Sequence, residues 1–113
     1  MFEAGSLVLL PFPFSDAKTT KRRPVLALTA PDEYGDFIGM AVSSRSHHGN
    51  SVVLQNDAIV QGILPKQSWI RTDRIVTLSA SLVIKSFAKI RPDVHRQAVD
   101  SLCELLHKQI FPA

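Results

Sequence analysis

Two neighbouring stretches near the start of the chain decide the fold: Pro11-Phe12-Pro13-Phe14-Ser15-Asp16 and Lys21-Arg22-Arg23-Pro24-Val25-Leu26. The first closes an apolar run and the second opens another, so together they predict two strands joined by a polar loop. Because proline cannot donate a backbone hydrogen bond, Pro11 and Pro13 restrict the first strand to a sheet edge, a bulge or a barrel corner. Four cations lie on one rim of the predicted sheet: Lys18, Lys21, Arg22 and Arg23.

Length and charge narrow the class of protein and of partner. The chain has 113 residues, which fits one domain over residues 1–113 with its own hydrophobic core. Apolar residues make up 45% and charged residues 20%, which is typical of a folded globular protein. The net charge of +3 favours a polyanionic partner, and the cations on the rim make RNA the first one to consider.

The number of cysteines and the length of the apolar runs indicate the cellular compartment. Cys103 is the only cysteine, so an intrachain disulfide is impossible, which agrees with a reducing cytoplasm. Its place in an amphipathic pattern predicts a small core side chain rather than a nucleophile. The apolar run 7–10 follows Glu3 and stops at prolines, unlike a signal peptide, and no apolar stretch is long enough to span a membrane. We expect a cytoplasmic protein with no membrane partner.

Short apolar strands dominate the predicted secondary structure. They cover residues 6–14, 24–30, 37–44, 51–55, one or two strands within 68–79, and 85–90. Residues 92–109 predict one long helix, because Pro92 suits the first helical position and Asp93 the positive end of the helix dipole. Its expected buried stripe is Val94, Ala98, Leu102, Leu105 and Leu106. Residues 79–84 indicate a single helical turn. The fold class is mostly β, a small antiparallel barrel or tightly coiled sheet with a packed C-terminal helix.

Four stretches of the chain, taken in sequence order, carry a combined pattern. Residues 5–16 contain a glycine, an apolar run and an aromatic–proline turn, and residues 23–28 begin a strand with arginine and proline. Residues 41–44 end a strand with hydroxyl side chains, and residues 62–78 contain Ser68, Arg71 and Asp73 before the closing Thr77-Leu78. In this order, over nearly the whole chain, they resemble the MazF/PemK family of toxin endoribonucleases.

The resemblance implies a fold and a function. The fold would be an SH3-like barrel with a C-terminal helix, usually in a homodimer. The function would be that of the toxin in a type II toxin–antitoxin pair: a sequence-selective, metal-independent endoribonuclease that cleaves single-stranded messenger RNA and is silenced by an antitoxin protein. DNA would be contacted only indirectly, through an antitoxin–operator complex, and no cofactor is expected.

Four residues are candidates for the chemistry that the resemblance implies. The 2′-hydroxyl of the RNA would attack phosphorus and leave a cyclic phosphate and a 5′-hydroxyl. Arg23 and Arg71 would clamp the non-bridging oxygens, since a guanidinium matches a phosphate with two hydrogen bonds. Asp73 follows Arg71 by two residues, hence on the same strand face, and would accept the 2′-proton directly or through water. Ser43, with Ser44 beside it, would donate to the phosphate or orient the attacking oxygen.

Further residues are expected to contact RNA around these four: Lys18, Lys21, Arg22, Ser44, Arg45, His47, His48 and Trp69. Trp69 would stack on a base, with a place in the core or a dimer interface as the alternative. The two histidines suit acid–base chemistry, with a solvated loop as the plainer interpretation. No spacing of cysteines, histidines or carboxylates completes a metal site, so no metal is expected.

Plainer interpretations stay open for the other candidates. Arg71 and Asp73 would form an ion pair on a solvated strand, Arg22 would be an ordinary loop cation, and Ser44 rather than Ser43 would cap a turn. Two other function classes also stay open. One is a CcdB-like toxin that inhibits DNA gyrase, and the other is a non-catalytic barrel that binds nucleic acid or protein, with salt-dependent affinity in the case of nucleic acid.

Overall fold

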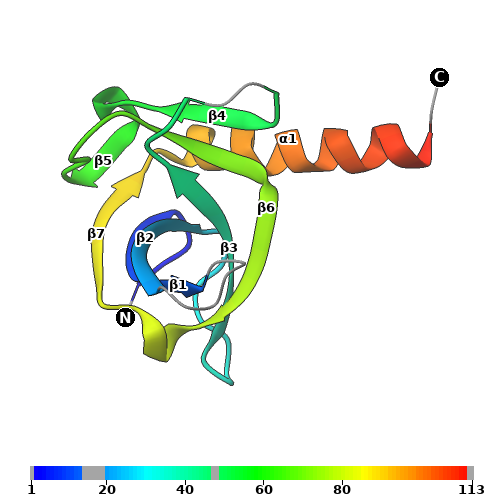
Figure 1. Cartoon of the computed structure of the whole chain (residues 1–113). Coiled ribbons are helices and arrows are strands. Elements are labelled where there is room, and N and C mark those ends of the chain that lie inside the picture. The colour runs from blue at the N-terminus through cyan, green and yellow to red at the C-terminus, as the bar shows by residue number, and fades with distance from the viewer. Residues whose placement is uncertain (1, 14–19, 47–48, 112–113) are drawn as a thin grey trace.

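One strongly curled antiparallel sheet and one long helix beside it make up the fold (Figure 1). The computed structural model describes residues 2–13, 20–46 and 49–111. The strands are β1 (Ser6–Pro13), β2 (Thr20–Ala27), β3 (Asp36–Ser43), β4 (Ser51–Leu54), β5 (Ile59–Gly62), β6 (Ser68–Ser79) and β7 (Lys85–Ile90). Two short 3₁₀ turns, η1 (Asn56–Ala58) and η2 (Ala80–Leu82), precede β5 and β7, and the helix is α1 (Pro92–Ile110). The strand order is β4-β6-β3-β2-β1-β7-β5, an open half-barrel with β4 and β5 at its edges.

β1 is an interior strand at its start and an edge strand at its end. Between Ser6 and Leu9 it pairs with both β2 and β7. Beyond Leu9 it pairs with β2 alone among the described strands, through Pro11 opposite Arg22 and Pro13 opposite Thr20. A missing backbone donor is tolerated where no second strand lies alongside. Of the three positions predicted for the two prolines, an edge, a bulge or a barrel corner, the structure shows the edge.

Buried side chains lie on both faces of the central strands. Leu7 of β1 packs into a cluster that continues through β3, β4 and β6 to Val94 and Ala98 of α1, which we call the helix-side core. The next residue, Val8, packs into a second cluster around Phe37 on the opposite face. Strands buried on both faces have continuous apolar runs rather than alternating ones, as this sequence does.

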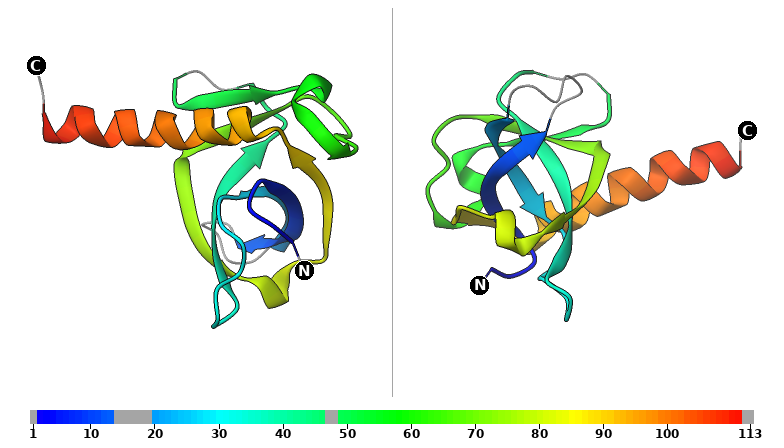
Figure 2. Two further views of the ribbon diagram at one scale, coloured as in Figure 1. Left: turned by 180° about the vertical axis from the view of Figure 1, so that it is seen from behind. Right: turned by 60° about the horizontal axis from the view of Figure 1, so that its bottom comes forward.

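Helix α1 contacts the sheet through its residues up to Leu102. Val94 and Ala98 are buried, Ser101 Oγ forms a 2.9 Å hydrogen bond with Thr72 Oγ1 of β6, and Leu102 packs against the helix-side core. The end of the helix extends past the sheet (Figures 1 and 2). The predicted burial is confirmed for Val94 and Ala98, and Leu102 and Leu105 are half-buried. It is wrong for Cys103, which is exposed, and for Leu106, which is 51% exposed. Among the described residues, no helix combines the length and the apolar character needed to cross a bilayer.

The predicted fold class, mostly β with a C-terminal helix, is confirmed. β6 is one strand of 12 residues whose register against β3 shifts between Met40 and Val42, which explains why its pattern was compatible with two strands. The expected helical turn is η2. β5 was not predicted, and this short strand pairs with β7 to form one edge of the sheet.

Candidate functional site

A groove of about 670 Å³ opens between the start of β2 and the loop that joins β5 to β6. Its base is formed by apolar side chains of the helix-side core, including Leu7 and Val42. We call it the basic groove, and it is lined by Leu7, Leu9, residues 22–24, Val42, Ser44, residues 62–66, Ser68, Lys85 and Phe87.

The basic groove concentrates charge of one sign. Among the described residues that line it, four are basic and none is acidic: Arg22, Arg23, Lys66 and Lys85. A cleft lined by a single sign of charge raises the local concentration of ligands of the opposite sign. The arrangement can therefore bind phosphates, with Ser44 and Ser68 as hydroxyl donors at the same surface.

The β1–β2 pairing delivers Arg22 to the groove. Leu9 lies opposite Pro24, and Pro11 lies opposite Arg22, so Arg22 and Pro24 share one face of β2 with the apolar side chain of Leu9. Because β7 begins at Lys85 opposite Leu9, no described strand other than β2 pairs with β1 where the arginines lie opposite it. The same local sheet edge accounts for both features: it tolerates the prolines, and no second described strand pairs with β1 opposite the arginines.

The opposite wall is a short loop held firmly at both ends. Gly62 has φ +82°, and a Cβ there would lie 2.2 Å from the Phe87 carbonyl oxygen, so only glycine permits this approach of β5 to β7. Leu64 is buried in the helix-side core, and Ser68 Oγ donates to Lys66 O at 3.0 Å. Ile63, between these anchors, is 76% exposed and lines the groove.

Arg71 and Asp73 contact each other on β6. Their Nε and Oδ1 atoms are 3.7 Å apart, and the side chains are 22% and 32% exposed. The residues between and before them, Ile70 and Thr72, are buried, so the pair projects from the opposite face, as the spacing predicts. Neither residue of the pair lines the basic groove. The geometry is that of a partly exposed ion pair.

Strand register relates Ser43 to Arg71. Ser43 lies opposite Trp69, and Arg71 lies two residues after Trp69 on the same face of β6. The β2–β3 ladder extends only to Val25 opposite Ala41, so within the described pairs Arg23 is not joined to Ser43.

The serines differ from expectation. Ser43 Oγ accepts the backbone N–H of Arg45 at 3.1 Å, so Ser43 caps the turn that follows β3. Ser44 is exposed and lines the basic groove. The prediction that Ser44 rather than Ser43 would cap a turn is wrong, because the hydroxyl one residue earlier has the two-residue spacing to the turn amide.

None of the remaining predicted contacts that the structure describes lines the basic groove. Lys21 and Arg45 are exposed, and Trp69 is half-buried. Lys18, His47 and His48 lie outside the described residues. Within the described ranges, no three His, Cys, Asp or Glu side chains are grouped to hold a metal ion.

Sequence reasoning missed four groove residues: Ile63, Lys66, Lys85 and Phe87. They come from β7 and from the loop after β5. β5 itself was not predicted as a strand. The one available signal was the run Ile63-Leu64-Pro65-Lys66, an apolar pair followed by proline and a cation. Their meeting with β2 depends on the β1–β7 pairing.

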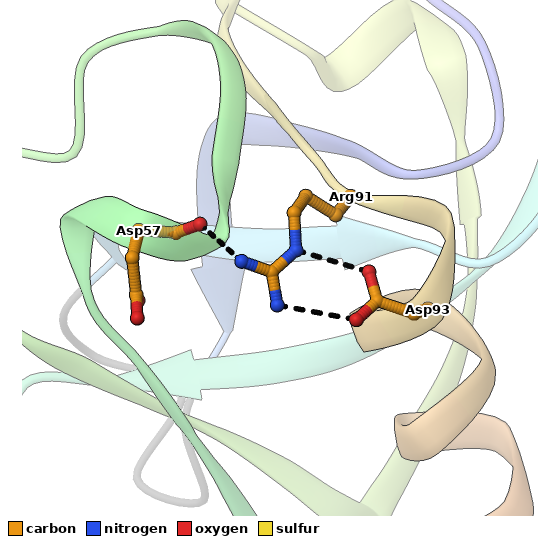
Figure 3. Close-up of polar contacts among 3 residues, drawn as sticks. All are labelled: Asp57, Arg91 and Asp93. Atoms are coloured by element: carbon orange, nitrogen blue, oxygen red, sulfur yellow. Dashed lines mark hydrogen bonds and ion pairs between the residues drawn. The ribbon is translucent and has the colours of Figure 1, made fainter.

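A second arginine cluster fastens the start of α1 (Figure 3). Arg91 donates from Nε and Nη2 to the two carboxylate oxygens of Asp93 at 3.0 and 3.1 Å, and from Nη1 to the carbonyl of Asp57. The hydrogen bonds from Arg91 hold the pKa of Asp93 below its usual value. This guanidinium joins η1 to the helix through three hydrogen bonds to oxygen atoms of this chain.

Known proteins share this fold over their whole length. The chain is similar to a MazE–MazF complex (Form-II) from Deinococcus radiodurans, with 24% identity, a TM-score of 0.75, and coverage of 94% of this chain and 96% of that one. MazF (Form-I) from the same organism gives 25% identity, a TM-score of 0.73 and the same coverage. An endoribonuclease in complex with its cognate antitoxin from a Mycobacterial species gives 12% identity, a TM-score of 0.70, and coverage of 95% and 96%.

Sequence comparison identifies the family. No curated protein matches the chain. The profile of the PemK-like, MazF-like toxins of type II toxin–antitoxin systems matches residues 3–106, which is most of the chain. The resemblance drawn from the sequence is confirmed, and the chain belongs to the PemK-like, MazF-like toxin family of type II toxin–antitoxin systems.

Proposed function

We propose that this toxin is a sequence-selective, metal-independent endoribonuclease that cleaves single-stranded RNA in the cytoplasm. The observation that supports this most is the basic groove, where four cations and no described carboxylate line one surface. RNA presents a phosphate at every nucleotide and is attracted to such a surface at long range. The comparison with a similar protein described as an endoribonuclease supports the same reaction class.

The phosphate is held first. Arg23 binds the non-bridging oxygens of the scissile phosphate with two parallel hydrogen bonds, and Arg22 holds a neighbouring phosphate. Both arginines line the basic groove, which supports these two roles. As negative charge grows on the phosphorane oxygens, the interaction with Arg23 strengthens. Loss of one such donor in an enzyme site lowers the rate by about 10²–10³-fold.

Proton transfer involves Asp73, with Arg71 beside it on β6. The 2′-oxygen attacks phosphorus while its proton passes to the Asp73 carboxylate, directly or through one water. The bond to the 5′-oxygen breaks and that oxygen takes a proton from solvent water, giving a 2′,3′-cyclic phosphate and a 5′-hydroxyl. Arg71 sits 3.7 Å from Asp73 and neutralises charge on the departing oxygen. It does not supply a proton, because a guanidinium is not deprotonated in proteins.

Ser43 and its neighbours position the substrate. Ser43 holds the turn at Arg45 through its hydroxyl oxygen, which leaves its O–H available to donate to a phosphate oxygen. Ser44, Lys21, Arg45 and Trp69 contact the flanking nucleotides. Lys18, His47 and His48, which lie outside the described residues, stay candidates for RNA contact.

Partner proteins regulate the site. A similar MazF was solved with MazE, and a similar endoribonuclease with its cognate antitoxin, which supports an antitoxin partner for this chain. We propose that the toxin forms a homodimer and that an acidic antitoxin segment covers the basic groove. DNA is reached only through the antitoxin bound to its operator.

The reaction is tested with purified protein and single-stranded RNA in excess EDTA, followed by mapping of both ends of each product. We expect cyclic phosphate and 5′-hydroxyl ends at one recurring sequence. Arg71→Ala and Asp73→Asn should each lower cleavage at least about a hundredfold with an unchanged Tm. Arg96→Ala is the matched control, because Arg96 lies exposed on α1 beside Asp100.

Two results would contradict the proposal. Intact RNA after long incubation with folded wild-type protein would exclude the nuclease, and DNA breaks on expression would then favour a gyrase poison. Wild-type rates in both β6 variants would move the chemistry away from Arg71 and Asp73.

A further inference from the structure

β7 contains a bulge beside the basic groove, and the bulged residue is Phe87. Leu7 pairs with Ala88 and Val8 pairs with Ser86, so within the described strands no β1 residue lies opposite Phe87. Ala88 is buried in the helix-side core, and Phe87 packs against that same core. Consecutive residues of a regular strand point to opposite faces, whereas a bulge re-aims one of them. The bulge thus turns Phe87 toward the groove side of the sheet.

The position of Phe87 is set by the backbone around it. The carbonyl of Phe87 accepts the N–H of Ile63 at 3.4 Å, and Gly62 allows β5 to approach this carbonyl closely. The side chain is half-buried, with part of it on the core and part on the groove. A ring held in this way loses little conformational freedom when a ligand covers its open face.

Phe87 is the one aromatic residue among the described residues that line the basic groove. Lys85 lies two residues earlier on β7, about 6.8 Å along the strand, and also lines the groove. Arg22 and Arg23 approach from β2. An aromatic ring next to a row of cations is the arrangement by which proteins bind single-stranded nucleic acid, with bases on the rings and phosphates on the cations.

We propose that Phe87 is the stacking platform for one unpaired base of the RNA substrate, while the groove cations hold the adjacent phosphates. This inference rests on the proposed nuclease function and assigns a base-binding position within it. Because every base has a π-face, Phe87 contributes affinity and fixes which nucleotide lies next to Arg23, rather than reading base edges.

Binding is measured with a synthetic single-stranded RNA that spans the mapped cleavage site and has a 2′-deoxy nucleotide at the cleaved position, so that no attack can occur. Phe87→Leu should weaken binding about tenfold, because stacking on one aromatic ring is lost. Phe87→Tyr keeps the ring and should bind as the wild type does. Phe87→Met, which also fills the core space, is the second variant in case Phe87→Leu has a lowered Tm.

Salt dependence separates stacking from charge. In a plot of log affinity against log salt concentration, Phe87→Leu should keep the wild-type slope. Arg22→Ala should reduce the slope by about 0.7, the value for one phosphate contact on a single strand. A change of slope in Phe87→Leu would show that the groove charges had moved, and it would overturn the assignment of Phe87 to stacking.

An abasic scan of the same RNA supplies the decisive readout. One abasic position should cost the wild type about tenfold in affinity and cost Phe87→Leu almost nothing, because the base and the ring are partners. Equal losses in both proteins at every position would overturn the proposal. So would a loss of antitoxin-peptide binding with unchanged RNA binding, which would make Phe87 a peptide contact.

The stacking role of Phe87 and the nuclease function can be overturned separately. If wild-type protein cleaves RNA but the scan is additive, only the stacking role of Phe87 is overturned. If wild-type protein neither binds nor cleaves RNA, the proposed function is overturned and the stacking role with it.

Discussion

Two regions of this molecule, the start of α1 and the basic groove, use arginine in different ways. At the start of α1, Arg91 donates to both carboxylate oxygens of Asp93 and to the carbonyl of Asp57, so its charge is matched by this chain. In the basic groove, Arg22 and Arg23 share a surface with two lysines, and no described lining residue is acidic. The first region fastens two elements together, whereas the second gathers four positive charges along one groove. Surrounding carboxylates, rather than the presence of arginine, distinguish structure from recognition.

The largest expected effect is on RNA cleavage, and it should distinguish the basic groove from the start of α1. Arg23→Ala should lower RNA cleavage by about 10²–10³-fold, because a charge-matched donor to the phosphate is lost. Arg91→Ala should leave cleavage per folded molecule unchanged and lower the Tm by a few degrees. Initial rates and thermal melts of both variants check this pair. Equal losses of activity would remove the distinction between fastening and recognition.

A pair of glycines tests how the groove wall is held. Gly62 and Gly35 have nearly the same φ, +82° and +81°, but a Cβ at Gly62 meets the Phe87 carbonyl at 2.2 Å whereas nothing lies within 4 Å at Gly35. Gly35→Ala should cost about 1 kcal/mol from backbone strain alone. Gly62→Ala should cost at least about 3 kcal/mol, because β5 must also move from β7. Urea unfolding measures both free energies, and equal costs would show that the close approach is unimportant.

Salt should affect the groove and spare the helix junction. If all four groove cations contact phosphates, the log–log slope for single-stranded RNA is about −2.8, or roughly fiftyfold weaker binding between 50 and 200 mM salt. Lys66→Ala should make the slope shallower by about 0.7, while Arg91→Ala leaves it unchanged. Fluorescence titrations at several salt concentrations provide the slopes. A wild-type slope near zero would exclude phosphate recognition by the groove.

The smallest effect concerns the pH dependence of stability at the helix junction. Arg91 lowers the pKa of Asp93 in the folded protein, so ionised Asp93 stabilises the fold above its unfolded pKa of about 3.9. As the pH falls through the lower folded value, that contribution disappears. The stability difference between wild type and Asp93→Asn should therefore be constant from pH 5 to 8 and shrink below about pH 4. A difference that grows on acidification would reverse the sign of this linkage.

Local sequence predicted most of the fold. Pro11 and Pro13 located the strand edge, Pro92 and Asp93 located the start of α1, and apolar runs located the strands except β5. β5 has four residues and owes its existence to pairing with β7, which no local pattern encodes. The exposure of Cys103 and Leu106 depends on how far α1 extends past the sheet, again a tertiary property.

The candidate site also contains residues that local sequence predicts and residues that depend on long-range pairing. Arg22 and Arg23 were predictable, because they lie next to Pro24 in one continuous basic stretch. Lys85 and Phe87 were not, because they reach the groove through the β1–β7 ladder and through a bulge in it. Residues joined by long-range pairing have no fixed spacing in sequence, so composition and periodicity cannot bring them together.

Chemical shift mapping tests the central claim most directly, since 113 residues give well-resolved amide spectra. Titration with the uncleavable RNA should shift the amides of Arg22, Ser44, Ile63 and Phe87 at the basic groove, and leave those of Arg91 and Asp93 unchanged. Shifts confined to the helix junction or to the exposed half of α1, with a silent groove, would contradict the account.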